Sequence, residues 1–169
     1  ALELARHAIK SLPDDDWVTR AHLLNIEGLA FQYMENLAAA IQSFEAAIAA
    51  GERTGRTSDC FFAYTNLAFT AVVQGQLHRA HSLCQQVLNL AERDSALAKG
   101  APVLAYAYAT LSLVQFEWNQ VDAAVASARQ GVALAEKWRQ ADSLHYSLSC
   151  LSKALCAAGD LEEAFAANQ

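Results

Sequence analysis

Residues 159–164 read Gly-Asp-Leu-Glu-Glu-Ala, a turn residue followed by the start of a helix, and this pattern occurs four times. The other copies are Glu35-Asn36-Leu37-Ala38-Ala39-Ala40, Gly75-Gln76-Leu77-His78-Arg79-Ala80 and Asn119-Gln120-Val121-Asp122-Ala123-Ala124. Their first residues lie 40, 44 and 40 positions apart, from 35 to 75, 119 and 159. Seven positions earlier stands a small residue each time: Gly28, Ala68, Ser112 and Ser152. This shared register indicates an internal repeat.

Each repeat predicts a hairpin of two antiparallel helices. Gly or Asn at the turn can adopt the left-handed conformation that ends a helix, and the Leu or Val two residues later begins the apolar face of the next. Small residues on both helices allow the backbones to approach closely. The expected helices span residues 16–34, 37–54, 58–74, 77–94, 101–118, 121–139, 141–158 and 161 onward.

The predicted fold class is all-α: a right-handed superhelix of antiparallel hairpins like those of tetratricopeptide repeats (TPR). About four hairpins are expected, with repeats near 14–55, 57–94, 101–139 and 141–169, and residues 1–11 as the second helix of a preceding repeat. We expect 1–169 to be a single domain and a fragment of a longer chain. A hairpin cannot bury its apolar face alone, so stacked hairpins share a continuous core.

Composition supports a helical interpretation and excludes several classes of protein. Apolar residues make up 54% of the 169, including 36 alanines, and there are only two prolines, which argues against disorder and favours helix. The net charge of -6 and the absence of a basic stripe argue against nucleic-acid binding. No apolar run is long enough to span a membrane, and no signal peptide is present, so a cytoplasmic location is expected.

The candidate metal and catalytic groups each have a simpler structural interpretation. The four cysteines are irregularly spaced and are expected to be buried thiols in a reducing compartment. His78 and His81 lack a suitably placed further ligand, so no metal site is expected. The carboxylates of 14–16 suit the start of a helix. Glu117 has no second carboxylate placed to assist acid–base catalysis, so we expect no enzyme.

Three stretches resemble a known family. Residues 116–124, Phe-Glu-Trp-Asn-Gln-Val-Asp-Ala-Ala, and 131–138, Gly-Val-Ala-Leu-Ala-Glu-Lys-Trp, resemble "YEWNDLDAA … GLELARRW" in the helical-repeat region of LuxR-type, ATP-dependent transcriptional regulators related to MalT. Residues 64–68 with 74–77 resemble "NLAELYLAQGRL", and residues 154–164 resemble "VLLARGDLDGA". The resemblance covers nearly the whole chain.

The resemblance implies a sensor segment. Such regulators join an NTPase module, a linker, the helical-repeat sensor and a C-terminal helix-turn-helix, and in MalT the sensor receives a maltooligosaccharide. No Gly-x-x-x-x-Gly-Lys-Ser/Thr loop occurs in this chain, so ATP is implied for the parent protein only and no cofactor is expected in this segment. Transcription regulation would depend on modules outside these residues.

By analogy with TPR packing, the first helix of each hairpin lines a concave groove. The predicted groove residues combine aromatic rings with amide, hydroxyl and charged groups, which suits a sugar or an extended peptide. They are His22, Asn25, Gln32, Tyr33, Phe62, Asn66, Phe69, Tyr106, Thr110, Phe116, Glu117, Tyr146, Ser149 and Lys153, with Leu29, Val73 and Leu113 between them.

Two functions remain open at this point. The first is a sensor that binds a small-molecule inducer in the groove. The second is a scaffold that binds a partner protein or peptide there, although the paired Lys and Arg of a carboxylate clamp are missing. Exposed apolar faces at helix 1–11 and from 161 onward also predict self-association of the chain through its ends.

Overall fold

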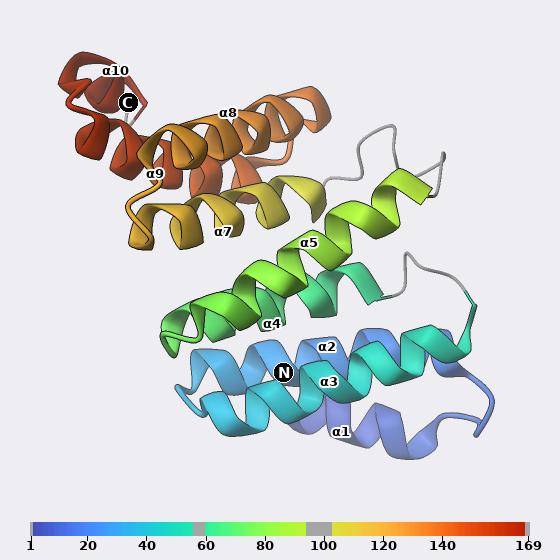
Figure 1. The fold of residues 1–169 in the computed structure, drawn as a ribbon. Coiled ribbons are helices and arrows are strands. Elements are labelled where there is room, and N and C mark those ends of the chain that lie inside the picture. Colours follow the sequence, from blue (N-terminus) through green and yellow to red (C-terminus); the bar gives the residue numbers. More distant parts are fainter. Residues whose placement is uncertain (1, 56–59, 94–102, 168–169) are drawn as a thin grey trace. The chain divides into compact units, whose positions relative to one another are not determined.

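A computed structural model describes residues 2–55, 60–93 and 103–167. Within these residues the regular elements are helices (Figure 1), and the all-α fold predicted from the sequence is confirmed. Where the predicted bounds fall on described residues, the observed ones differ by at most one residue; the predicted helix starts at 58 and 101 and the predicted end at 94 lie outside the described residues. The helices are α1 (Leu2–Ser11), α2 (Trp17–Tyr33), α3 (Leu37–Arg53), α4 (Phe61–Val73), α5 (Leu77–Arg93), α7 (Val103–Glu117), α8 (Val121–Trp138), α9 (Ala141–Ala158) and α10 (Leu161–Ala166).

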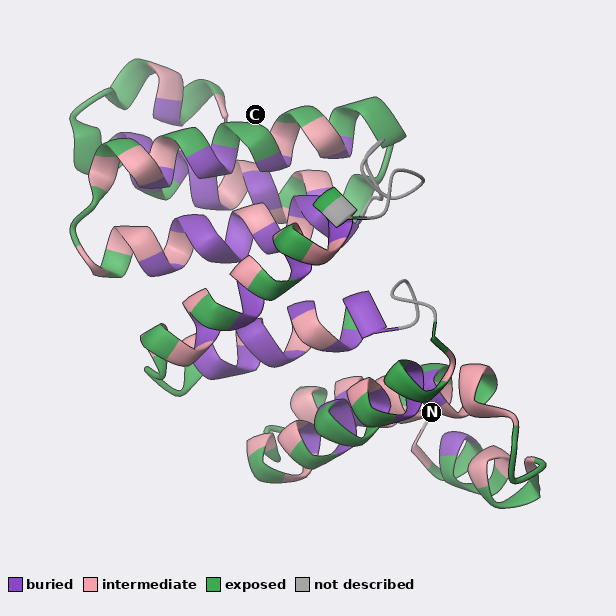
Figure 2. Ribbon diagram, turned by 45° about the vertical axis from the view of Figure 1, so that its right-hand side comes forward, coloured by how far each residue is buried: buried purple, intermediate pink, exposed green. Residues whose placement is uncertain are grey.

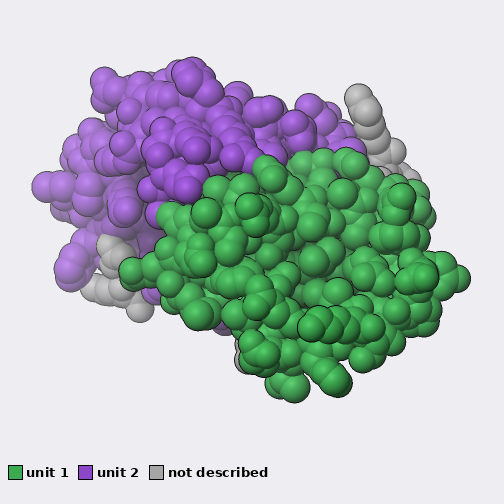
Figure 3. Space-filling view, turned by 90° about the horizontal axis from the view of Figure 1, so that it is seen from below, with its two compact units in different colours: residues 1–70 green, residues 71–169 purple. Residues whose placement is uncertain are grey.

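The chain forms two compact units, residues 1–70 and residues 71–169 (Figure 3). In unit 1, α2 packs against α3 as a hairpin and also contacts α1. In unit 2, α7 and α8 form a hairpin, α9 contacts both of them and α10, and α5 contacts α7. Helices from neighbouring repeats therefore pack against one another inside each unit, as expected of a helical-repeat protein.

The four repeated turns have the same backbone geometry. The first residue of each copy has a positive φ: Glu35 (60°), Gly75 (71°), Asn119 (56°) and Gly159 (85°). In each copy the next backbone N–H donates to a carbonyl five residues earlier, for example Gln76 N to Ala71 O at 2.8 Å and Asp160 N to Leu155 O at 3.0 Å. This bond closes the end of the first helix. Glu35 adopts the conformation without being Gly or Asn.

Helix starts are capped by side chains where the sequence predicts it. The Asp16 carboxylate accepts a hydrogen bond from Thr19 N at 3.0 Å and begins α2. This backbone hydrogen bond lowers the pKa of Asp16, because it favours the charged form. Asp160 accepts from Glu163 N at 3.3 Å and Asn36 from Ala39 N at 3.2 Å in the same way. The capping interpretation of the acidic cluster is confirmed for Asp16.

The small residues in register are where helices approach most closely. Gly28 and Ala68 are buried, as are Ser112 and Ser152, and the alanines Ala40, Ala80, Ala124 and Ala164 are almost completely inaccessible. A Cβ added at Gly28 would lie 2.4 Å from Cε1 of Phe44, whose ring is fully buried. Alanine-rich positions therefore serve helix packing. Figure 2 shows the resulting burial, which covers most of α7 and much less of α1 and α10.

Two side chains are more exposed than their residue types suggest. Cys60, Cys84 and Cys150 are buried thiols as predicted, but Cys156 is exposed near the C-terminal end of α9. Trp138 is exposed at the last residue of α8, where the following turn at Arg139 begins (φ 52°). Both positions lie at the end of a helix, where no further turn of helix covers the side chain.

Candidate functional site

The first helices of unit 1 are joined by hydrogen bonds between polar side chains. Asn66 Nδ2 of α4 donates to Asn25 Oδ1 of α2 at 3.0 Å. One turn further along, Gln32 Nε2 donates to Thr70 Oγ1 at 3.4 Å, and Thr70 Oγ1 itself donates to the Asn66 carbonyl at 2.8 Å. The predicted residues Asn25, Asn66 and Gln32 are thus brought together, in a row that also includes Thr70.

The amide pair still has unused hydrogen-bonding groups. The bond between Asn66 and Asn25 uses one N–H of Asn66 and the oxygen of Asn25. Each side-chain amide carries two donors and an acceptor, so the Asn25 NH2 group and the Asn66 oxygen remain. Both residues are half-buried. They can offer a donor and an acceptor side by side to a ligand.

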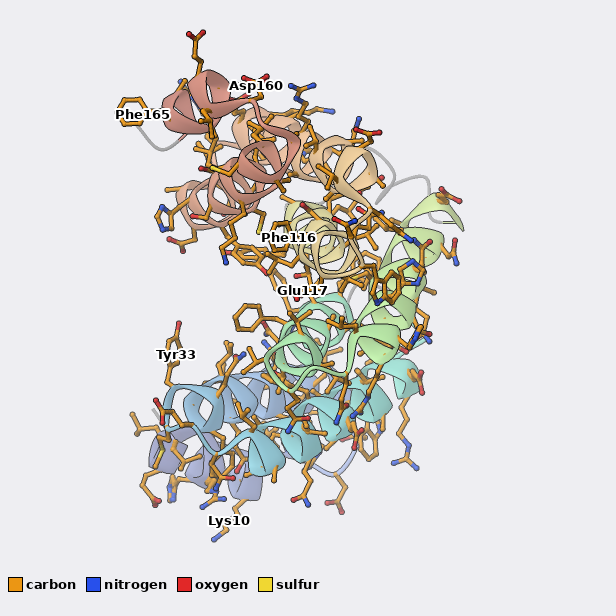
Figure 4. All side chains as sticks on the ribbon, turned by 60° about the vertical axis from the view of Figure 1, so that its left-hand side comes forward. Lys10, Tyr33, Phe116, Glu117, Asp160 and Phe165 are labelled. Carbon is orange, nitrogen blue, oxygen red and sulfur yellow. The ribbon has the colours of Figure 1, made fainter. Side chains whose placement is uncertain are left out.

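Exposed aromatic and apolar side chains occur on the same two helices. Tyr33 is 87% exposed, and Phe62 and Ile26 are also exposed, while Phe69 is half-buried and His22 lies in solvent. Figure 4 shows Tyr33 projecting from the end of α2. No charged residue occurs in α4, and the Glu27 carboxylate of α2 is taken by Arg6 (2.7 Å) and Ser43 (3.3 Å). This face, called the α2–α4 face below, is aromatic and nearly uncharged.

In unit 2 the first helices are joined by aromatic stacking instead. The rings of Tyr106 in α7 and Tyr146 in α9 stack with centroids 6.0 Å apart and an interplanar angle of 29°. The hydroxyl groups of Thr110 and Tyr146 lie 3.3 Å apart and share a hydrogen bond. Burial raises the pKa of Tyr146 well above its usual range, so the phenol stays neutral. We call this surface the α7–α9 face.

The remaining predicted residues of unit 2 lie along these two helices. Phe116 is half-buried and Glu117 is exposed at the end of α7 (Figure 4). Ser149 donates to the His145 carbonyl at 2.9 Å, and Lys153 is exposed. The ammonium of Lys153 favours the thiolate of Cys150, but burial has the larger effect and raises the pKa of that thiol to about 12. Thr110 itself is buried beneath the tyrosine pair.

Sequence reasoning missed Thr70 as a partner of the polar row. A signal existed, because the equivalent positions in the other repeats are Ala30, Val114 and Ala154, all apolar. A hydroxyl group at a position that is otherwise apolar indicates a specific hydrogen bond.

The histidine pair lies beside an aromatic side chain of the next first helix. The rings of His78 and His81 in α5 lie 5.1 and 5.2 Å from the ring of Trp118 at the end of α7. They are therefore packed against an indole rather than merely solvated. Cys84 is buried, as predicted, and burial raises the pKa of its thiol to about 12. Across the described ranges, no group of three or more His, Cys, Asp and Glu side chains is placed to hold a metal ion.

The comparisons with solved structures define the class. BtubC (BKLC) from P. vanneervenii matches with a TM-score of 0.76 at 18% identity, over 98% of this chain and 68% of that one. The apo form of RapI matches with a TM-score of 0.73 at 11% identity, over 98% and 45%. The TPR-like repeats of a putative kinesin light chain from Podosopora anserina match with a TM-score of 0.65 at 22% identity. This match covers 98% of this chain and 81% of that one. The fold is that of a TPR-like helical-repeat protein.

The family is also defined. The model of the MalT-like TPR region matches residues 1–169, and the chain belongs to this family. No curated protein sequence matches the chain significantly. None of the helices in the described residues has the length and hydropathy needed to cross a lipid bilayer.

Proposed function

We propose that this chain is the sensor segment of a LuxR-type, ATP-dependent transcriptional regulator related to MalT, and that an inducer binds to its first-helix faces. Membership of the MalT-like TPR family supports the regulator context. The observation that carries the binding proposal is the chemistry of the α2–α4 and α7–α9 faces. Each combines aromatic rings with neutral hydrogen-bonding groups. The role is binding, not catalysis.

The charges on the first helices indicate the kind of inducer. The helix α4 has no charged residue and α7 has only Glu117, at its last position. The helix α9 adds the isolated cation Lys153 and Asp142, and α2 has Arg20 and Glu27. An anionic ligand such as a sugar phosphate would find no cluster of cations there. A neutral ligand with apolar faces and several hydrogen-bonding edges would instead stack on rings such as Phe62 and bond to Asn25 and Asn66 on the α2–α4 face.

An inducer acts on such a protein only through a difference in affinity. It must bind one arrangement of the regulator more tightly than another, and the population then shifts toward that arrangement. The NTPase and DNA-binding modules of the proposed parent would respond to this shift. ATP would bind to the NTPase module, outside the residues of this chain.

Calorimetric titration of the chain with a panel of neutral oligosaccharides and their phosphorylated analogues tests the binding proposal. We expect at least one neutral compound to bind and its phosphorylated analogue to bind at least tenfold more weakly. Asn66→Ala should weaken binding to the α2–α4 face at least tenfold, and Tyr106→Ala should do the same for a compound bound to the α7–α9 face. Gln42→Ala and Gln130→Ala, at exposed positions on second helices, should change neither. Equal binding of the charged and neutral members, or no binding at all, would overturn the proposal.

The regulator context has its own test. The reading frame that encodes this chain should also encode a phosphate-binding Gly-x-x-x-x-Gly-Lys-Ser/Thr loop and a basic helix-turn-helix. If the parent protein lacks both modules, the regulator proposal is wrong, and the second function, a scaffold that binds a partner protein, is favoured.

The scaffold alternative has one specific observation in its favour. The Asn25 NH2 group and the Asn66 oxygen offer a donor and an acceptor together, which matches the N–H and C=O of an extended peptide backbone. Titration with a library of uncharged extended peptides separates the two functions. Peptide binding that Asn66→Ala abolishes, combined with no response to any small molecule, would favour the scaffold.

A further inference from the structure

The last turn of α8 exposes an aromatic ring between two cations. Trp138, the final residue of the helix, is 43% exposed, whereas Trp17 and Trp118 are half-buried. Lys137 stands before it and Arg139 after it, and both are exposed. These three consecutive residues, called the Trp138 patch below, lie outside the first-helix faces and have no role in the functions proposed above.

An earlier repeat ends its second helix with different residues. In the repeat register, residues 134–139, Leu-Ala-Glu-Lys-Trp-Arg, align with residues 50–55, Ala-Gly-Glu-Arg-Thr-Gly. Thr54 Oγ1 donates a hydrogen bond to the Gly51 carbonyl at 2.7 Å and helps to close the end of α3. Trp138 stands in the place of this threonine, and an indole has no hydroxyl group to make the same bond. The requirements of a helix end therefore do not explain the tryptophan.

Arg139 adopts a backbone conformation that suits the glycine to which it corresponds. The φ angle is 52° at Arg139 and 68° at Gly55. A residue with a side chain meets a steric cost in this left-handed region that glycine avoids. Glu35 meets the same cost in a repeated turn, so the strain at Arg139 is significant only together with the exposed ring beside it. Strained residues of this kind cluster at sites that bind something.

The charged groups near the patch leave its positive side open. Lys137 Nζ lies 5.9 Å from the centroid of the Trp138 ring, within cation–π range. Glu136 comes two residues before Trp138 and so lies about 200° around the helix, on the opposite side. Asp142 lies in the first turn of α9, where the helix dipole stabilises a carboxylate. Among the residues that the structure describes, no carboxylate lies within ion-pair distance of the Arg139 guanidinium.

The environment of Trp17 shows what a compensated cluster looks like. Its ring also lies beside two arginines, Arg53 at 4.1 Å and Arg20 at 5.6 Å. That ring is half-buried, and the carboxylate of Asp16 is close enough to interact electrostatically with Arg20. The cluster at Trp17 therefore contains its own anion, whereas the Trp138 patch does not.

An exposed indole beside two cations indicates a particular kind of partner. Trp and Arg are among the residues enriched at the energetic centre of protein–protein interfaces. A guanidinium binds a carboxylate through two parallel hydrogen bonds, and an indole packs on apolar side chains. Two cations in a chain with a net charge of -6 are too few to hold a nucleic-acid backbone. An acidic protein segment fits the patch best.

We propose that the Trp138 patch binds an acidic segment of a partner protein. A carboxylate of the partner would accept two hydrogen bonds from Arg139, a second would lie near Lys137, and an apolar side chain between them would pack on Trp138. The proposal is independent of the inducer, because the patch belongs to a second helix. Three residues make a small contact, so a short peptide is expected to bind with a dissociation constant on the order of 1 mM.

Two-dimensional magnetic resonance of the isotope-labelled chain tests the proposal, because each tryptophan gives a separate indole N–H signal. The probes are the peptide Gly-Glu-Phe-Asp-Gly and its neutral counterpart Gly-Gln-Phe-Asn-Gly, both with acetylated and amidated ends. At low salt the acidic peptide should shift the signal of Trp138 and leave those of Trp17 and Trp118 in place. The neutral peptide should bind about tenfold more weakly, because it forms no charge-assisted hydrogen bond.

Two variants that restore the residues of the earlier repeat identify the side chains responsible. Arg139→Gly and Trp138→Thr should each weaken binding of the acidic peptide about tenfold. In the second variant the backbone N–H signal of Arg139 reports binding. Arg139→Gly should melt no lower than the unmodified chain, because it removes a strained side chain. Lys10→Gln is the matched control: it removes one cation from the exposed end of α1, another second helix, and should leave binding unchanged.

The contrary outcomes separate an acidic protein segment from other occupants. No shift at Trp138, equal binding of the two peptides, undiminished binding by Arg139→Gly, or an equal shift at Trp17 would each overturn the proposal. So would sedimentation of the chain with phosphatidylserine vesicles, without binding of the peptide, which would assign the patch to an anionic surface. A Trp138 signal that moves with protein concentration alone would assign it to a second copy of the chain.

Discussion

Units 1 and 2 are built from the same hairpin but join neighbouring first helices with different chemistry. Unit 1 uses the amide bond between Asn66 and Asn25. Unit 2 uses the stacked rings of Tyr106 and Tyr146 over a buried hydroxyl. Amide bonds leave donors and acceptors for a ligand, whereas stacked rings offer an apolar platform. The repeat conserves backbone geometry, and the side chains set what each face can bind.

The two units also differ where helices approach most closely. In unit 1, Gly28 makes room for the Phe44 ring. In unit 2, small residues meet on both sides: Gly131 lies against Ser147 and the Ala105 carbonyl, and the buried hydroxyls of Ser112 and Ser147 have no hydrogen-bond partner. In unit 1 a large ring fills the space beside the glycine. In unit 2 small residues meet there, and buried hydroxyl groups remain without hydrogen bonds. Substitutions at these positions should separate the units.

The largest effect is expected from Gly28→Ala. Its Cβ would lie 2.4 to 3.0 Å from three atoms of the Phe44 ring, which is fully buried and cannot swing away. Overpacking of this kind costs about 3 kcal/mol, and the better helix propensity of alanine offsets about 1 kcal/mol. Urea unfolding should therefore show a net loss of about 2 kcal/mol, and hydrogen exchange should place the loss in α2 and α3.

Two companion variants sharpen this prediction. Phe44→Leu should recover part of the loss in the double variant, because it removes the clashing ring atoms. Gly131→Ala should be less costly, because the closest atom to its added Cβ is the Ser147 hydroxyl oxygen, at 2.9 Å. Ser147→Ala should recover only part of this loss, because the added Cβ would still lie 3.1 Å from the Ala105 carbonyl oxygen. Equal losses in both units, or no rescue by Phe44→Leu, would contradict the proposed difference.

Alkaline pH should destabilise unit 2 through the buried thiols of Cys84 and Cys150, at lower pH than it acts on Tyr64 of unit 1. Burial raises the pKa of Cys84 and of Cys150 from 9.0 to about 12. The unfolded chain then loses these protons first, so stability falls as pH rises from about 9 toward about 12, by about 1.3 kcal/mol per thiol between pH 8 and 10. In unit 1, burial and the nearby Glu52 raise the pKa of Tyr64 from 10.0 to about 12, so its contribution is lost only above pH 10.

Thermal unfolding at pH 8 and pH 10 measures this difference. Cys84→Ala and Cys150→Ala should each flatten the decline in melting temperature, whereas Cys156→Ala, at an exposed thiol, should leave it unchanged. If the melting temperature still falls between pH 8 and pH 10 in a chain with both Cys84→Ala and Cys150→Ala, groups other than these thiols cause the fall.

The sequence predicted the backbone well and the side-chain partners less well. Helix bounds followed from turn residues in register, because the left-handed residue and the small contact positions are local requirements. The pairing of Asn25 with Asn66 spans 41 residues and depends on how two helices cross, which no local pattern encodes. The exposure of Cys156 was not predicted for a related reason: a cysteine is usually buried, but the position of Cys156 near the end of α9 leaves it exposed.

A smaller effect, with the opposite sign, is expected from Ser147→Ala in unit 2. The Ser147 hydroxyl is completely buried without a hydrogen-bond partner. Removing an unpaired buried polar group relieves its desolvation cost, so the variant should be more stable by about 1 kcal/mol. Ser143→Ala, one turn earlier in α9, is the matched control: its buried hydroxyl donates to the Gln140 carbonyl at 3.2 Å, and its loss should cost about 1 kcal/mol. Destabilisation by both variants in urea unfolding would argue that Ser147 is bonded after all.

The smallest effects should come from the two ion pairs that attach the outer helices. Arg6 of α1 and Glu27 of α2 lie 2.7 Å apart, the Glu27 side chain is only 13% exposed, and Ser43 and the Phe31 ring add contacts. Arg129 and Glu163, between α8 and α10, lie 2.6 Å apart but are 54% and 43% exposed. Solvent screens the exposed pair, so Arg129→Ala should cost less than about 0.5 kcal/mol, and Glu27→Gln about 1 kcal/mol.

Hydrogen exchange of the α1 and α10 amides, with and without high salt, measures the effect of each ion pair. Because the Glu27 carboxylate is largely shielded from solvent, although Arg6 is 47% exposed, α1 should lose less protection in high salt than α10. An equal response of the two helices would remove this difference between the units.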